Sequence, residues 1–433
     1  KNIATISLLC FLYRLLHTAN HVTTQSSCTL TNMPGPEVPV QHLPERTRKS
    51  FTTFFAALTA LSFHWSVVIY INSSYLEQFL SESDISLLYV VGALVTMACF
   101  IAAPVILNRY GNYTLTLFFA VLESVALIGM AFSDTAHTAA LWFTLHSIVV
   151  SLLFLHADVF MEEMIGTEEN GTGSLRGLLL TIMSFMAAGA TLLSGVLIGD
   201  EEPRFGLAYT ASALTLIPFM VILMRHFKHF KDPEYPHLAF VPTALAFWKH
   251  RDLRNVFCAT FLLQIFFVWM VIYVPIYMNR IIGFDWEIIG AILFVGLLAY
   301  GLFEWPIGLI ADQWIGEKEM MALGFLIIAV ATSWIAFLKP DQLSLWFITM
   351  FITRIGGSLV ETTTESYFFK HIGGKDAAFV SIFRITRPLS YIIGALLGSV
   401  ALLFLPSYNL LFIVLALFMI PGLFFAMALK DTK

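Results

Sequence analysis

Charged and hydroxyl side chains recur at helical spacing within one long apolar stretch near the C-terminus. Arg354, Ser358, Glu361 and Glu365 follow one another at intervals of four, three and four residues, so on a helix their side chains form one stripe. A charge inside an apolar helix of membrane length costs at least about 2.5 kcal/mol, and such a residue faces a partner or a water-filled path. The stripe therefore indicates a carboxylate that exchanges a proton, or an arginine that binds an anionic group.

Two arginines lie one helical turn apart in the next apolar stretch. Arg384 is followed by Arg387, and Tyr391 comes four residues after Arg387. Glu361 and Arg384 each lie nine residues from a lysine that marks a membrane surface, which puts both about 13 Å deep at the helical rise per residue. Equal depth allows Glu361 to pair with Arg384 or with Arg387.

Each of these groups also has a structural interpretation. Glu365, Arg384, Asp158 and Arg176 lie nearer the surface and fit ion pairs that brace or gate the inner side. A deep histidine suits a proton relay because its pKa lies near neutrality, although a hydrogen-bonded core histidine has the same sequence, and Glu123 also fits a residue on the outer ring of helices. The candidates for substrate binding or proton coupling are Arg354, Glu361, Arg387, His64 and Glu123.

Composition limits the class of protein. The 433 residues are 58% hydrophobic and 12% charged, with a mean hydropathy of +0.80, whereas soluble domains have about 25% charged residues. The net charge of -5 gives no basic field for nucleic acid. The four cysteines have no disulfide or metal-site spacing. We find no phosphate-binding loop and no catalytic motif, so we expect neither a cofactor, nor a metal site, nor an enzyme.

The apolar stretches predict membrane-spanning helices. A span needs about 20 apolar residues, and in lipid it is helical because its backbone must bond within the segment. The sequence therefore predicts an all-α integral membrane protein with about twelve spans. Their predicted ranges are 50–72, 85–107, 112–132, 138–161, 174–199, 205–225, 254–278, 287–311, 319–338, 343–370, 375–404 and 407–429.

Basic residues predict the orientation of these spans. Apart from Arg204, Arg280 and Lys339, the lysines and arginines near the span ends fall on one side of the membrane. That side is cytoplasmic by the positive-inside rule. Both termini are then cytoplasmic, and we expect a multi-pass protein of the plasma or inner membrane. The predicted parts are a poorly ordered or non-native leader (1–49), two six-helix bundles (50–225 and 254–430) and a cytoplasmic linker (226–253).

The two bundles resemble each other. Residues 65–75 and 269–277 both begin with tryptophan and carry two tyrosines at nearly the same places. A carboxylate also precedes an arginine by a similar interval in both halves: these pairs are Asp158 with Arg176, and Glu365 with Arg384. Parallel repeats of six spans are a transporter architecture, with the substrate held between the halves.

Two loops carry a more specific resemblance. Residues 308–318 read GLIADQWIGEK, and residues 104–111, after the second span, read PVILNRYG. The first resembles the loop signature of the major facilitator superfamily, with one extra residue before Gly316 and a glutamine in the basic position. The second resembles a degraded copy, in which Asn108 replaces the aspartate.

The resemblance implies an inner gate. In the family the aspartate contacts a helix N-terminus and an arginine of the opposite half, which would pair Asp312 with Arg176, and the glycines permit a tight turn. The Asn108 loop would face the start of the eleventh span. The inner-gate candidates are Asp312, Gly308, Gly316, Asn108, Arg109, Asp158, Arg176, Glu365 and Arg384.

The expected function follows from topology and resemblance together. We expect a monomeric secondary transporter that moves a small solute by alternating access, coupled to protons through Glu361 and its neighbouring arginines. A non-transporting membrane sensor or scaffold that reuses the fold is the alternative. The deep arginines hint at an anionic solute.

Overall fold

A computed structural model describes residues 45–165, 172–199, 203–233, 240–311, 315–372 and 377–430. The chain divides into a unit of residues 1–41 and a unit of residues 42–433, and all described residues belong to the second. Most of the predicted leader thus lies outside the described residues. The secondary structure of the described part is entirely helical.

The helices confirm the predicted fold class. Twelve are long and apolar enough to cross a membrane, among the residues that the structure describes. The first half of the chain supplies six of these spans. Their helices are α2 (Glu45–Val68) with α3 (Asn72–Glu77), α4 (Glu82–Tyr110), α5 (Asn112–Ala131), α6 (Ala136–Ile165), α7 (Thr172–Ile198) and α8 (Phe205–His226).

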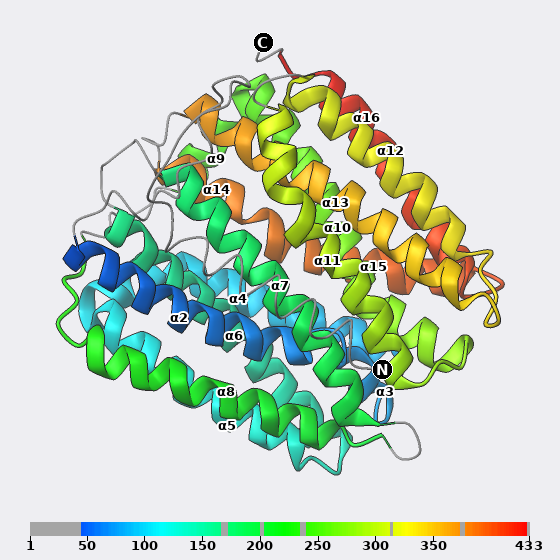
Figure 1. The fold of residues 1–433 in the computed structure, drawn as a ribbon, viewed down its shortest axis with the longest axis horizontal. Helices are drawn as coiled ribbons and strands as arrows, with labels where there is room; N and C mark the ends of the chain where they lie inside the picture. Colours follow the sequence, from blue (N-terminus) through cyan, green and yellow to red (C-terminus); the bar gives the residue numbers. More distant parts are fainter. Residues whose placement is uncertain are drawn as a thin grey trace, which may run out of the picture. The chain divides into compact units, whose positions relative to one another are not determined.

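The second half repeats this arrangement after a short helix, α9 (Phe240–Lys249). Figure 1 shows the helices of the first half, coloured blue to green, on one side and those of the second half, coloured bright green to red, on the other. The helices of the second half are α10 (Arg251–Ile276) with η2 (Tyr277–Ile281), α11 (Trp286–Ile310), α12 (Glu317–Ile335), α13 (Leu343–Ile372), α14 (Ala377–Arg384) with α15 (Thr386–Phe404), and α16 (Leu410–Met427).

Helix packing within the halves follows one pattern. In the first half α2 packs on α7 and α8, α5 packs on α6 and α8, and α4 packs on α6. Each pairing recurs six spans later: α10 packs on α15 and α16, α12 packs on α13 and α16, and α11 packs on α13. The internal repeat predicted from scattered residues is therefore a repeat of helix packing.

The halves meet along helices α7 with α11 and α4 with α15. The α7–α11 contact is backbone to backbone: a Cβ added to Gly290 would lie 2.7 Å from the carbonyl oxygen of Thr191, and one added to Gly195 would lie 2.5 Å from that of Trp286. Small residues permit such close helix packing in membranes. Two glycines thus allow the backbones of the two halves to come into contact near one end of the bundle.

We call that end, away from the segment between α8 and α10, the distal end, and the opposite one the linker end. The predicted linker is partly helical, because α9 lies within it. The side chain of Phe247 is fully buried and packs against Phe257 and Phe368 of the second half. An aromatic anchor therefore ties this segment to the second half. Helix α2 begins at Glu45, before the first candidate span, which starts at Thr52, near the predicted start at residue 50.

Candidate functional site

Arg354 lies at mid-depth between the two halves. Its side chain is 1% exposed. Its guanidinium donates to the hydroxyl of Tyr70 at 3.5 Å and lies 5.5 Å from the ring centre of Phe266. Tyr70 belongs to the break between α2 and α3. The predicted deep arginine therefore contacts the opposite half at the point where the first span is interrupted.

Arg387 also faces the opposite half. Its guanidinium lies 5.2 Å from the ring centre of Trp65, and a cation over an aromatic face is attracted to it. One turn further along α15, Tyr391 stacks on Tyr89 of the first half at 5.9 Å. The side chain of Arg387 is nevertheless exposed, so a charged group at mid-depth remains accessible.

Glu365 and Arg384 form an ion pair with a distance of 2.9 Å between Oε1 and Nη1. Glu361, one turn deeper and only partly buried, has no ion pair within 4 Å among the described residues. It interacts electrostatically with Glu365, Arg387 and Arg384. Arg384 is thus paired with Glu365. Glu361 interacts with Arg384 and Arg387 at longer range, without an ion pair among the described residues.

A further polar contact joins the halves along the α7–α11 line. The hydroxyl of Ser184 donates to the carboxylate of Glu304 at 3.3 Å. Both side chains are partly buried. This pair also belongs to the helices whose backbones meet at Gly195 and Gly290.

His64 and Glu123 belong to a buried cluster inside the first half. Nδ1 of His146 lies 2.5 Å from Oε1 of Glu123, and Nε2 of His64 lies 3.5 Å from the same oxygen. Asn72 Nδ2 lies 3.4 Å from His146 Nε2, and the hydroxyl of Tyr209 donates to Asn72 at 2.9 Å. The fully buried carboxylate of Glu123 therefore links three spans, and Tyr209 of a fourth span joins the cluster through Asn72. The main partner of this carboxylate, His146, was not predicted.

The predicted inner gate is described only in part. Asp312 and the side chain of Arg176 lie outside the described residues. Asn108, Arg109 and Asp158 are exposed at the linker end. The structure thus leaves the predicted pairing of Asp312 with Arg176 as a prediction.

The glycines of the two loops differ in backbone conformation. Gly111 has a φ of 77° and Gly316 a φ of 97°, a backbone region that is essentially restricted to glycine. These two residues end the corresponding loops of the two halves. Gly308 instead lies inside α11. The expectation that each glycine of the motif makes a turn is wrong for Gly308, because α11 extends past it.

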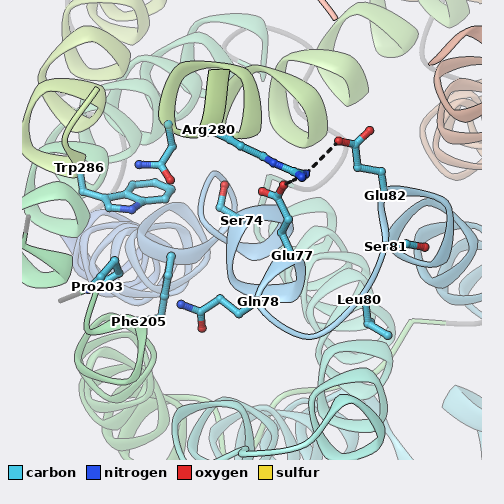
Figure 2. A pocket seen from close by; sticks show the side chains of 11 residues that line it. Ser74, Glu77, Gln78, Leu80, Ser81, Glu82, Pro203, Phe205, Arg280 and Trp286 are labelled. Atoms are coloured by element: carbon cyan, nitrogen blue, oxygen red, sulfur yellow. Dashed lines mark hydrogen bonds and ion pairs between the residues drawn. The ribbon is translucent and has the colours of Figure 1, made fainter. Parts of the chain in front are cut away.

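The distal end carries a pocket of about 670 Å³ lined by both halves. Figure 2 shows Arg280 of η2 reaching two carboxylates of the first half. Its Nη1 lies 2.5 Å from Oε1 of Glu77 and 3.5 Å from Oε1 of Glu82. The sequence analysis did not predict this contact of Arg280 with Glu77 and Glu82, which we call the latch. The available signal was that Arg280 is one of few basic residues on its side of the membrane and lies opposite acidic span ends.

Comparisons with known proteins agree with this architecture. Residues 3–229, more than half of the chain, match the MFS_1 like family, and residues 256–433 match the Major Facilitator Superfamily. A comparison with curated proteins finds no match. A mutant of the nucleoside transporter NupG has a similar crystal structure, with a TM-score of 0.66 and 12% identity over 88% of this chain and 99% of that one. The chain is therefore a multi-pass membrane transporter of the major facilitator superfamily.

Proposed function

We propose that the protein is a secondary active transporter that moves a small solute by alternating access. The observation that carries this proposal is the contact between two related six-span halves, which meet along α7 with α11 and α4 with α15. At the distal end Arg280 of the second half also pairs with Glu77 of the first half. A breakable ion pair between the halves at one end is expected of a protein whose halves rock against each other.

We take the distal end as the outer side and both termini as cytoplasmic, following the basic residues of the linker end. We also propose that the protein works as a monomer in the lipid bilayer, because one chain already supplies both halves, which pack on each other. The membrane is the plasma membrane or a bacterial inner membrane.

Proton coupling is the second part of the proposal. Glu361 interacts electrostatically with Arg384 and Arg387, and Arg387 is accessible beside Trp65. Protonation of Glu361 removes a negative charge from this group, which leaves Arg387 available for an anionic part of the solute, while Arg384 stays paired with Glu365. A ligand shifts the equilibrium between two states only by its differential affinity, and this change of charge supplies such a difference.

Purified protein in proteoliposomes tests the proposal. A thermal-shift screen against metabolites and drugs at two pH values first identifies a solute, and its uptake is then measured against pH. We expect Glu361→Gln to abolish the pH dependence. Glu319→Gln, which alters a carboxylate paired with Lys318 on its own helix, is the control and keeps that dependence.

Two results would contradict the proposal. Transport by Glu361→Gln with an unchanged pH dependence would remove Glu361 from coupling. Absence of solute flux, together with retention of a tight protein partner in pull-down experiments, would favour a non-transporting sensor or scaffold.

A further inference from the structure

The distal pocket contains buried polar groups whose hydrogen-bonding capacity is unused. Trp286 lines the pocket and is 3% exposed, and its Nε1 has no hydrogen-bond partner. Ser74, on the opposite half, also lines the pocket and is 6% exposed, and its Oγ has no partner either. A buried donor without a partner is unfavourable, because it has lost its hydrogen bond to water. Two such groups in one pocket indicate a ligand that supplies the missing partners.

The charges around the pocket favour a cation. Glu77 and Glu82 share the single guanidinium of Arg280, which is 59% exposed. The distances are unequal, 2.5 Å to Glu77 and 3.5 Å to Glu82, so the carboxylate of Glu82 retains most of its capacity to accept hydrogen bonds. Among the described lining residues, the carboxylates thus exceed the cations by one.

One wall of the pocket is apolar and fits the aromatic or aliphatic part of a ligand. The ring of Phe205 lies 5.3 Å from that of Trp286 in an edge-to-face arrangement. In Figure 2 these rings, with Pro203, stand on one side of the pocket, and the carboxylates of Glu77 and Glu82 stand on the other. A ligand between them meets an apolar wall at one end and an acidic one at the other.

We propose that this pocket binds a small organic cation that carries an ammonium group at one end and a hydrogen-bond acceptor at the other. The ammonium group donates to Glu82, the acceptor takes the indole N–H of Trp286, and the body of the ligand lies against Phe205. Because both halves line the pocket, the bound cation holds them together at the distal end. The site is independent of the central arginines and of whether the protein transports this ligand.

Three ligands of nearly equal shape test the proposal. Tyramine carries an ammonium group and a phenol, tyrosol replaces the ammonium with a neutral hydroxyl, and 4-hydroxyphenylacetate replaces it with a carboxylate. Binding of each to the full chain in lipid nanodiscs is measured by calorimetry. We expect tyramine to bind about tenfold or more tightly than tyrosol, as a charge-assisted hydrogen bond provides, and 4-hydroxyphenylacetate not to bind. Equal affinity for tyramine and tyrosol, or no binding of tyramine, overturns the proposal.

Variants then assign the contacts. Glu82→Gln is expected to weaken tyramine about tenfold and to leave tyrosol unchanged, whereas Trp286→Phe, which removes the N–H together with part of the indole ring, weakens both about fivefold. Asp134→Asn is the control, because Asp134 is exposed in the loop between α5 and α6 at the same end. It is expected to keep wild-type affinity, and a loss as large as that of Glu82→Gln overturns the assigned contact with Glu82. Wild-type affinity of Glu82→Gln for tyramine overturns the proposal, and the comparison of ligands on the unaltered chain does not depend on the folding of any variant.

Discussion

Glu77 and Arg280 occupy equivalent ends of the first and seventh spans, 203 residues apart, and their side chains meet at 2.5 Å. This separation matches the offset of the internal repeat. Equivalent positions of two related halves come together only near the axis that relates the halves. The ion pair therefore lies where a rocking motion of the halves would first separate them.

Loss of this ion pair is expected to favour opening of the distal end. Exposed ion pairs contribute up to about 1 kcal/mol, which corresponds to about a fivefold change in population. We expect Arg280→Gln to increase the rate at which a membrane-impermeant thiol reagent labels a cysteine placed at Ser74, in a chain without its native cysteines. Arg204→Gln, at the same end but outside the latch, should leave the rate unchanged. Equal labelling of both variants would show that the pair does not control access.

The contact between Gly290 and α7 predicts a second sensitive position. A Cβ at Gly290 would lie 2.7 Å from Thr191 O, which is backbone and cannot move aside alone. Gly290→Ala is expected to separate the halves at the distal end, raise thiol labelling at Ser74 and slow transport. Gly189→Ala on α7 is the matched control, since a Cβ there has nothing within 4 Å. If Gly290→Ala transported as well as Gly189→Ala, the backbone contact would not be needed.

The buried cluster around Glu123 predicts a stability effect confined to the first half. Removal of one member of a buried hydrogen-bonded pair leaves the other without its partner, which costs about 1–3 kcal/mol. We expect Glu123→Ala to lower the melting temperature in detergent strongly and Glu123→Gln, which keeps an acceptor for His146, to lower it less. Ser124→Ala, a neighbouring change on α5 with only a local backbone hydrogen bond, is the control. Equal melting temperatures for Glu123→Ala and Ser124→Ala would contradict a bracing role.

The two glycines of residues 308–318 should respond differently to substitution. Gly316 has a φ of 97° and a ψ of 155°, so Gly316→Ala is expected to destabilise by about 1–3 kcal/mol. Gly308 lies within α11, and a Cβ there would make an ordinary contact of 3.8 Å with Thr362. Gly308→Ala should therefore be neutral or stabilising by up to about 1 kcal/mol. Thermal unfolding of both variants checks this, and a larger loss for Gly308→Ala would contradict the assigned helix boundary.

Parts of the candidate site were predictable because they depend on local spacing. The stripe on α13 and the arginine pair on the eleventh span follow from helical periodicity, which operates within one segment. The residues with which these side chains pair were harder to predict. Depth alone allowed Arg384 to reach Glu361, but Arg384 pairs with Glu365, because side-chain direction and helix rotation decide among carboxylates one turn apart.

By itself, the sequence determined the membrane class, the number of spans and their division into two related halves. The first two follow from the cost of exposing polar backbone or charge to lipid, a constraint that acts on every segment separately, and the third follows from residues that recur at one interval along the chain. Only the tertiary structure decided which distant groups meet. His146 joins Glu123, and Arg280 joins Glu77, because contacts between helices depend on how each helix is rotated and tilted against its neighbours, and no local pattern records that.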